Sequence, residues 1–501
     1  MNRPSSAQLV DAGIGVIAGV AALAGSLLAA GDSPAFVGAG AAAVVRDTAP
    51  GFVAVGVRSL GELAQPLLVA TTGVLLLGAY ATLTLLAGRY VTDTSTRALA
   101  TLGLVGGLTL VLSGSAFGAL GAGIGSALVV GAANATLDLG RPTGRETPPG
   151  RRRLLQAAGV AVATLAASAI RLREPASTGD VDREPRDPGA AELLSAAEDR
   201  SFSLPDTDPL VSDGFYTVDI ASVDPNLGPS DWDLTVTGEV PEERTFSLSE
   251  LQQMEGERRF VTLRCVSDPL NGTKIDNALW DGVPVSSVLD EAGAPESCCV
   301  TLHAADDYFV SFPREALDDG LLAWGMNGRP LPRGHGAPLR TLVPGHWGET
   351  NAKWLTEIEI RDEPEKGYWE QRGWEGTGEV KTVAKLHSTT VDGEAVRVGG
   401  HAYAGTDGIS AVEVSTDGGD SWTEAALTDP LPGAVPLDAE NPEPDGEAAD
   451  AWRMWQHEYE ATERHEVVVR AIDGNGERQP EAESDLRPSG PTGWVSETIQ
   501  I

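Results

Sequence analysis

Cysteine, lysine and histidine are all scarce in this chain. Its 501 residues include only three cysteines, Cys265, Cys298 and Cys299, which are too few for a disulfide framework. No CxxCH motif occurs, which excludes covalently attached haem, and no CxxC pair points to a zinc or iron–sulfur site. None of the seven histidines lies in residues 1–173, so that region lacks the axial ligands that a membrane haem b needs.

Positive charge is also scarce, and it is unevenly distributed. The chain has 72 acidic and 36 basic side chains, but residues 1–173 contain only 7 acidic and 12 basic ones. A nearly neutral region is therefore followed by a very acidic one, which holds all five lysines. An acidic, lysine-poor surface stays solvated at high salt, which predicts a halophilic protein. The same acidity excludes nucleic acid as a partner, because phosphates would be repelled.

The first 173 residues contain long uncharged runs. A run of about 20 apolar residues is long enough to span a bilayer. The candidate spans are Ala12–Ala30, Leu67–Ala87, two within Ala98–Leu137 that turn around Gly114–Gly123, and Leu154–Ile170. Residues 31–62 are interrupted by charges and are interpreted as a loop or interfacial segment. We therefore expect an α-helical membrane anchor of about five spans over residues 1–173. Buried helices of a soluble protein are the alternative.

Arginines set the expected orientation of this anchor. Loops 88–97 and 138–153 are rich in arginine and flank the same helical hairpin, so the positive-inside rule places both in the cytoplasm. With five spans, everything after the anchor then lies on the extracytoplasmic side of the cell membrane. The run Arg151–Arg153 before Leu154 and Leu155 is typical of a twin-arginine export signal. A plain positive-inside flank is the alternative.

The rest of the chain favours one α+β domain and one β domain. Residues 174–209 are rich in proline, aspartate and glutamate and predict an acidic, flexible linker. Short strand-like runs with two short helices predict an α+β domain over residues 210–372. Strand-like runs separated by Asp-Gly turns predict a β-sandwich of immunoglobulin type over residues 373–501. Within it, residues 429–450 are expected to form a surface loop.

An ordered series of motifs lies between residues 258 and 361. Its members are Thr262–Ser267, Trp280–Pro284, Met326–Pro332, His335–Arg340, Pro344–Gly348 and Lys353-Trp354. This series resembles the molybdopterin-binding domain of the sulfite oxidase family, and two stretches after residue 407 resemble that family's dimerisation domain. The resemblance runs from about residue 212 to the end of the chain, and the order of the motifs makes it specific.

The resemblance implies a cofactor, molybdenum with molybdopterin, and the residues that hold it. In that family one cysteine at the end of a strand gives its thiolate to molybdenum, and its motif maps onto Cys265. The histidine, arginine and lysine that hold the pterin and its phosphate map onto His335, Arg340 and Lys353. The candidate residues that border the cofactor near the start of the domain are Tyr216, Thr217 and Asp219. The dimerisation domain implies a homodimer.

The chemistry of these residue types agrees with that implication. A thiolate is a soft ligand suited to molybdenum bound by a dithiolene. A phosphate favours the planar donors of an arginine and the point charge of a lysine, which Arg340 and Lys353 supply. Ordinary salt bridges with carboxylates are the alternative for both. Cys265 taken alone is a small buried apolar residue, and Cys298 and Cys299 are predicted to be strand-core residues.

One departure from the family bears on the substrate. True sulfite oxidases follow their cysteine with a Gly-Asn-Arg-Arg type run whose arginines hold the oxyanion, whereas Val266–Gly272 here contains an aspartate and no arginine. Arg264 is the candidate substitute, and Tyr308 is a further candidate catalytic residue. We expect an oxidoreductase that transfers an oxygen atom and two electrons to or from a small oxyanion or oxide. The alternatives are a reductase of nitrate or sulfoxide type on the same fold and a non-catalytic, membrane-anchored binding protein.

Electron transfer is expected to need a separate protein. The sequence contains no motif for a second redox centre, and residues 1–173 are predicted to carry no haem. Electrons would then pass between the molybdenum and a small copper protein or cytochrome that docks on the outer face. Direct exchange with quinone at the membrane surface is the alternative.

Overall fold

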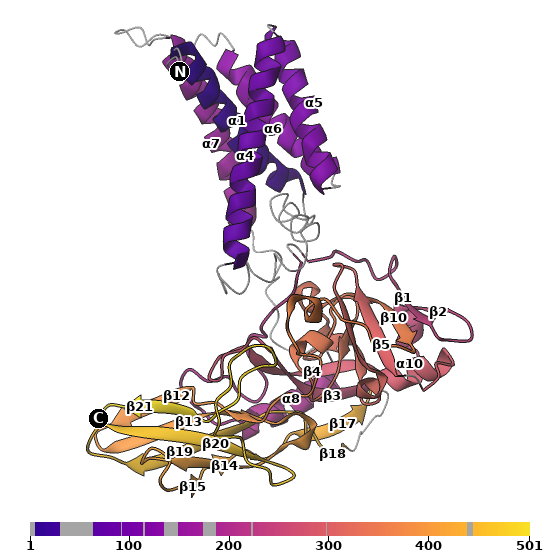
Figure 1. The fold of residues 1–501 in the computed structure, drawn as a ribbon, viewed down its shortest axis with the longest axis vertical. Coiled ribbons are helices and arrows are strands. Elements are labelled where there is room, and N and C mark those ends of the chain that lie inside the picture. Colours follow the sequence, from indigo (N-terminus) through magenta and orange to yellow (C-terminus); the bar gives the residue numbers. More distant parts are fainter. Residues whose placement is uncertain are drawn as a thin grey trace. The chain divides into compact units, whose positions relative to one another are not determined.

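The computed structural model describes residues 6–30, 64–91, 93–113, 116–134, 149–173, 187–221, 224–296, 298–437 and 444–501. The chain divides into two compact units (Figure 1). The helical unit comprises residues 1–181 with a short segment at 220–226. The β-rich unit comprises residues 182–219 and 227–501.

The helical unit contains five helices in its described residues. They are α1 (Ser6–Ala30), α4 (Ala64–Tyr90), α5 (Thr94–Ser113), α6 (Ala116–Asn134) and α7 (Pro149–Arg173). Each contains one of the predicted apolar runs. Three stretches are long and apolar enough to cross a membrane, namely Gln8–Ser26, Thr71–Tyr90 and Thr94–Val111, and a shorter apolar stretch lies at Gly118–Asn134. The predicted loop at 31–62 lies outside the described residues.

Small residues let α1 and α6 approach each other closely. A Cβ atom on Gly25 would lie 2.2 Å from the carbonyl oxygen of Gly121, and a Cβ atom on Gly125 would lie 2.2 Å from the carbonyl oxygen of Ala21. Any side chain at either glycine would therefore force the two helices apart. Crossings over small residues are typical of helices that pack inside a membrane.

Part of the predicted linker is folded. The helix α8 (Pro188–Arg200) begins after Asp187, whose side chain accepts a hydrogen bond from the backbone N–H of Ala190 at 3.0 Å. An aspartate cap followed by proline is a strong helix start. Ala190 and Ala197 are fully buried against the β-rich unit. The second half of the 174–209 linker thus differs from the prediction, because an acidic composition concealed a helix with a small apolar face.

Two sheets form the first half of the β-rich unit. Their strands are β1 (Asp233–Gly238), β2 (Arg244–Ser247), β3 (Glu257–Arg264), β4 (Ile275–Pro284), β5 (Cys299–Ala304), β6 (Phe309–Pro313), β7 (Leu321–Met326), β8 (Arg329–Pro330), β9 (Arg340–Leu342), β10 (Leu355–Arg361), β17 (Pro432–Pro436) and β18 (Asp445–Glu447). One sheet has the order β2-β1-β10-β5-β6, and the other has the order β18-β17-β3-β4-β7-β8 with β9 paired to β7. The short helices α9 (Leu248–Leu251) and α10 (Val285–Glu291) follow β2 and β4. This mixture agrees with the predicted α+β domain.

Two further antiparallel sheets form the C-terminal half of the unit. Their strands are β11 (Val383–Ala384), β12 (Ser388–Asp392), β13 (Ala395–Tyr403), β14 (Ile409–Ser415), β15 (Thr423–Glu424), β16 (Ala426–Leu427), β19 (Arg453–Glu460), β20 (His465–Asp473) and β21 (Val495–Ile499). The orders are β11-β13-β19-β16, with β12 beside β13, and β15-β14-β20-β21. Apolar residues of both sheets share one core. We call residues 373–501 the C-terminal domain.

The predicted surface loop at 429–450 contains strands. In β17, Val435 pairs with Arg258 and Pro436 pairs with Glu257, so β17 extends the sheet that carries β3. The prolines hid this strand from the sequence pattern, although proline is compatible with a short strand of this kind. The C-terminal domain therefore contributes a strand to the sheet from which the candidate site is built.

Candidate functional site

The candidate metal ligand lies where β3 ends. Cys265 follows the last residue of that strand and is 7% exposed. Its Sγ lies 3.1 Å from the hydroxyl oxygen of Ser267, and burial raises the pKa of the thiol. Among the described residues it is the free cysteine.

The two other cysteines are bonded to each other. Cys298 and Cys299 form a disulfide between adjacent residues. The prediction that both belong to a strand core is wrong for Cys298, because β5 begins only at Cys299 and leaves Cys298 exposed outside the sheet. Cys299 is buried as predicted. Cys265 is therefore the one thiol of the chain's three cysteines that can act as a ligand.

Arg264 precedes the cysteine and is completely buried. Its Nη1 donates a hydrogen bond to the carbonyl oxygen of Lys381 at 2.9 Å, and its guanidinium lies 4.9 Å from the ring centroid of Trp347. Nε and Nη2 have no hydrogen-bond partner within the described part of the chain. Burial lowers the pKa of Arg264 to about 10, which still leaves it charged at neutral pH. The site thus holds a buried cation with unused donors.

The predicted pterin-binding turn is compact. Arg340 donates through Nη1 to the carbonyl oxygen of His335 and through Nη2 to that of Asn351, both at 3.2 Å, while its Nε has no partner in the described residues. Gly336 has φ of 110°, and a Cβ atom there would lie 3.0 Å from the Cα atom of Lys353. Glycine is therefore required at this turn. Burial lowers the pKa of His335 to about 4, so its imidazole is neutral at neutral pH.

Lys353 connects this turn to the start of the domain. Its Nζ donates to Oδ2 of Asp219 at 2.6 Å and to the carbonyl oxygen of Gly334 at 3.0 Å. Lys353 thus forms an ion pair with Asp219, whereas Nη1 and Nη2 of Arg340 donate to backbone carbonyl oxygens. Thr217 lies on the same N-terminal segment and is exposed.

Tyr216 brings that segment towards the cysteine. Its backbone N–H donates to Oδ2 of Asp276 at 2.6 Å. A Cβ atom on Gly348 would lie 2.8 Å from the Tyr216 hydroxyl and 3.2 Å from the carbonyl oxygen of Arg264. Burial, together with the charge of Cys265, raises the pKa of Tyr216 well above its usual value. Tyr216 therefore lies near both Cys265 and Arg340.

Tyr308 belongs to a neighbouring buried group that the sequence did not reveal. Its hydroxyl donates to the backbone carbonyl oxygen of Glu349 at 2.6 Å. Burial, followed by the nearby carboxyl of Glu370, raises the pKa of Glu349 to about 9. The two glutamates are separated along the chain and belong to no motif, so only the fold brings them together.

The C-terminal domain also reaches the site. The backbone N–H of Trp347 donates to the carbonyl oxygen of Gly378 at 3.3 Å, and the N–H of Val380 donates to that of Gly345 at 2.8 Å. Together with the bond from Arg264 to Lys381, these contacts line one side of the cysteine with residues 378–381. These contacts use backbone groups of residues 378–381, so no side-chain pattern of the sequence could reveal them.

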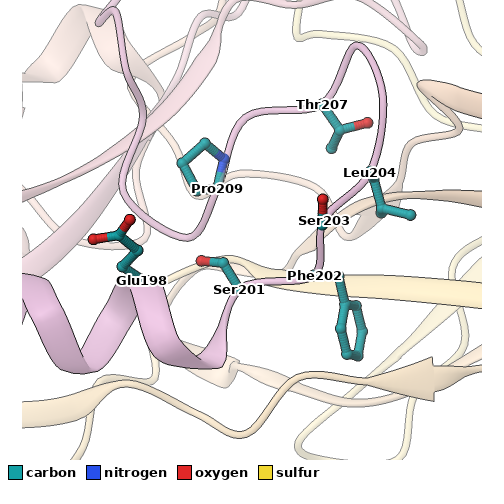
Figure 2. A pocket seen from close by; sticks show the side chains of 7 residues that line it. All are labelled: Glu198, Ser201, Phe202, Ser203, Leu204, Thr207 and Pro209. Carbon is teal, nitrogen blue, oxygen red and sulfur yellow. The ribbon is translucent and has the colours of Figure 1, made fainter.

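The cluster fits a metal-bearing pterin with a phosphate. Cys265 offers a soft sulfur ligand, and Arg264 and Arg340 offer buried donor nitrogens without partners in the described residues. Buried hydrogen-bond donors are destabilising unless each one finds an acceptor. The pocket drawn in Figure 2 shares no residue with this cluster; it is lined by Glu198, Ser201, Phe202, Ser203, Leu204, Thr207 and Pro209.

Comparison with protein families agrees with this arrangement. Residues 220–369 match the oxidoreductase molybdopterin binding domain, and residues 379–487 match the Mo-co oxidoreductase dimerisation domain. The first match contains the predicted cofactor residues from Cys265 to Lys353, and the second contains Lys381.

Two proteins and one solved structure are similar to parts of this chain. The mitochondrial sulfite oxidase of Rattus norvegicus is 29% identical over 334 residues, which cover 55% of this chain and 59% of that protein. The uncharacterized oxidoreductase YuiH of Bacillus subtilis (strain 168) is 31% identical over 154 residues, which cover 30% of this chain and 74% of that protein. The sulfane dehydrogenase SoxCD from Paracoccus pantotrophus has a TM-score of 0.46 and 22% identity, covering 60% of this chain and 88% of that chain.

The chain spans between half and three fifths of the length of the mammalian sulfite oxidases it matches. The two domain matches and the bacterial oxidoreductase, which is matched over most of its length, agree with the motif series around Cys265. The chain belongs to the sulfite oxidase family and is a molybdenum-dependent, molybdopterin-binding oxidoreductase.

Proposed function

We propose that this enzyme transfers an oxygen atom and two electrons to or from a small oxyanion or oxide. The observation that carries the proposal is the free, buried thiol of Cys265 beside the buried guanidinium of Arg264. Two donor nitrogens of that guanidinium have no partner in the described residues, so an anionic or oxide substrate would complete them. Tyr308 is the second proposed catalytic residue, although its hydroxyl is already bonded to a backbone carbonyl.

The proposed cofactor contacts are of two kinds: a metal ligand, and residues that bind the pterin and its phosphate. Cys265 would hold the metal through Sγ, and the bound molybdenum would supply the redox chemistry. Arg340 and Lys353 would hold the phosphate, and the neutral imidazole of His335 can give or accept one hydrogen bond from the pterin. The proposed residues of the bordering segment are Tyr216, Thr217 and Asp219. Asp219 keeps Lys353 in place through their 2.6 Å ion pair.

Metal and pterin analysis of the purified full chain tests this proposal. We expect about one molybdenum and one pterin per chain when the host makes the cofactor. As a control, Cys298→Ser/Cys299→Ser should keep full loading, because neither residue lies in the cluster. A folded, metal-free chain from such a host would contradict the proposal.

The direction of the reaction is a second question. The absence of arginine from residues 266–272 supports a reductase of nitrate or sulfoxide type as the second candidate. Assays with sulfite and an oxidising dye, and with nitrate or sulfoxides and a reduced dye, separate the two. The non-catalytic alternative is not retained, because the chain belongs to an enzyme family.

For the helical unit we propose a five-span anchor over residues 1–173, with residues 210–372 and 373–501 on the extracytoplasmic side. The run Arg151–Arg153 is proposed as an internal twin-arginine signal. Arg153 also pairs with Asp11 at 3.1 Å, which a lysine can imitate. Replacing all three arginines with lysine should therefore keep the bundle but trap the β-rich unit inside. Normal digestion of that unit by protease added to intact cells would rule out the signal.

We further propose that the anchor carries no haem and that a separate copper protein or cytochrome exchanges electrons with the enzyme. The absence of histidine from residues 1–173 supports the first point. A Soret band that accompanies the full chain through purification would overturn it. The match to the dimerisation domain supports a homodimer formed through residues 373–501, which light scattering of the detergent-solubilised chain would detect.

A further inference from the structure

A fully buried ion pair joins the loop after Cys265 to the C-terminal domain. Lys385 follows β11, and its Nζ lies 2.5 Å from Oδ2 of Asp268. Both side chains are completely inaccessible to solvent. Burying two charges is unfavourable unless their hydrogen bonds are complete, because each ion loses its hydration. The remaining bonds of this pair therefore indicate what it does.

The ammonium group of Lys385 directs its donors to a single loop. Besides Asp268, it donates to the carbonyl oxygen of Gly272 at 2.7 Å and to that of Leu270 at 3.3 Å. A lysine ammonium has three hydrogens, so these bonds use all of them. Lys385 is thus committed to holding residues 268–272 and has no donor left for a cofactor or substrate.

Asp268 in turn is hydrogen-bonded to the backbone of the cysteine. Its Oδ1 accepts a hydrogen bond from the backbone N–H of Lys274 at 2.9 Å, and its own N–H donates to the carbonyl oxygen of Cys265 at 3.0 Å. The N–H of Cys265 in turn donates to the carbonyl oxygen of Lys274 at 3.0 Å. The carboxylate therefore closes the loop at the residue that carries the thiol.

Neighbouring contacts leave little freedom in this loop. The side chain of Asn271 donates to the carbonyl oxygen of Leu386 at 2.8 Å and accepts from its N–H at 2.9 Å. A Cβ atom on Gly272 would lie 2.2 Å from Oδ1 of Asp268, so no other residue fits there. Residues 385–386 of the C-terminal domain thus bond to both Asp268 and Asn271 of the loop.

We propose that Lys385 is a positioning residue for the thiol of Cys265 and acts through Asp268. The inference rests on the proposed role of Cys265 as the metal ligand. The residues that hydrogen-bond to a metal ligand fix the position of its ligand atom, and their removal lowers the affinity for the metal. In this enzyme the supporting group comes from another domain, 117 residues further along the chain. The C-terminal domain therefore completes the metal site as well as forming its own sandwich.

Thiol alkylation of the full chain, produced in a host without molybdopterin, tests the proposal. Cys298 and Cys299 are joined to each other, so under non-reducing conditions the alkylation rate reports on Cys265 alone. In Lys385→Met we expect a rate at least about ten times that of the wild type, together with a lower Tm, because the loop opens and Asp268 keeps an uncompensated charge.

The double variant Asp268→Asn/Lys385→Met separates positioning from stability. It removes both charges of the pair, so its Tm should recover. The alkylation rate of its thiol should remain high, because the loop is no longer held. The matched control is Arg470→Met, which removes the partly buried pair of Arg470 and Glu413 in the same domain. It should lower Tm and leave the alkylation rate unchanged.

A wild-type alkylation rate in the double variant would overturn the proposal and reduce the pair to a stabilising contact. The double variant also decides the matter if Lys385→Met does not fold. Molybdenum analysis of the wild type from a cofactor-producing host is independent of this rate. An absence of metal there would overturn the proposed function, whereas the alkylation result concerns only the loop.

Discussion

A buried hydroxyl of the helical unit and a buried ammonium of the β-rich unit find their partners in different ways. In the helical unit, Ser126 donates to the carbonyl oxygen of Ala122, four residues earlier, at 2.9 Å. In the β-rich unit, Lys385 reaches Asp268 across 117 residues of sequence. The first kind of bond keeps a single helix intact, whereas the second ties distant loops together. A site assembled from several loops depends on bonds of the second kind.

An ion pair that joins distant residues of the helical unit is more exposed than the pair of Lys385 and Asp268. Arg153 and Asp11 are 142 residues apart, but their side chains are 32% and 39% exposed. Exposed ion pairs contribute about 0–1 kcal/mol, since water competes for both partners. These two ion pairs therefore differ in burial, and the predictions below extend the comparison between buried sites of the β-rich unit and the helical unit.

The largest effect is expected at the thiol. Cys265→Ser should keep the β-rich unit folded while lowering turnover by at least about a thousandfold, because a hydroxyl is a poor ligand for a soft metal site. Steady-state assays with a dye, at measured cofactor loading, check this. Unchanged specific activity at full loading would exclude Cys265 as the ligand.

A buried amide comes next. The side chain of Asn351 is nearly buried, accepts from the N–H of Val343 at 2.7 Å and donates to the carbonyl oxygen of Trp347 at 3.1 Å. Asn351→Ala should lower the free energy of unfolding by about 2–4 kcal/mol, since buried groups lose their partners. Asn475→Ala, at an exposed turn of the same unit, is the matched control and should change it by less than about 0.5 kcal/mol. Equal effects would contradict the distinction.

The pH dependence of stability should also reside in the β-rich unit. Glu349 has an ordinary pKa of 4.5 that is raised to about 9 in the folded chain. Between these values the unfolded chain releases the proton and the folded chain keeps it, so stability falls as pH rises. The slope is at most about 1.4 kcal/mol per pH unit. Glu349→Gln should reduce the slope of the free energy of unfolding against pH. Denaturant unfolding at intervals of about one pH unit, from about pH 5 to about pH 9, measures that slope. Identical slopes would contradict the raised pKa of Glu349.

The smallest effect is expected for a hydroxyl bonded within its own helix. Ser126→Ala in α6 should change the stability of the helical unit by no more than about 0.5 kcal/mol, because the backbone bond of the helix survives and alanine is a good helix former. Thermal unfolding in detergent measures this. A loss above about 1 kcal/mol would show that local hydroxyl bonds matter here as much as long-range ones.

The same difference explains what the sequence could reveal. The five helices were predicted because the apolar runs are continuous, and no distant partner is needed to recognise them. Cys265, His335, Arg340 and Lys353 were predicted because each sits in a short motif with fixed neighbours. In the structure, Arg340 and Lys353 bond to the turn that carries His335, and Tyr216 lies near both Cys265 and Arg340.

Other features depend on the fold and had no local signal. Lys385 and Asp268 lie in unrelated stretches, and Glu349 meets Glu370 only after two turns have formed. The helix α8 was obscured because its acidic residues resemble those of a linker. In each case the stabilising contact is made with a part of the chain that the local pattern does not include.

The burial of cations has a consequence for how a substrate arrives. Arg264 and Arg340 are at most 4% exposed, so the surface that an approaching anion meets is even more negative than the formal net charge of −36 indicates. Long-range repulsion then slows the encounter, and dissolved salt screens that repulsion at separations beyond about a Debye length. For an anionic substrate, the second-order rate constant should therefore rise with ionic strength, opposite to enzymes that steer anions with exposed cations. At high salt, screening by dissolved ions therefore speeds the approach of an anionic substrate to the buried site.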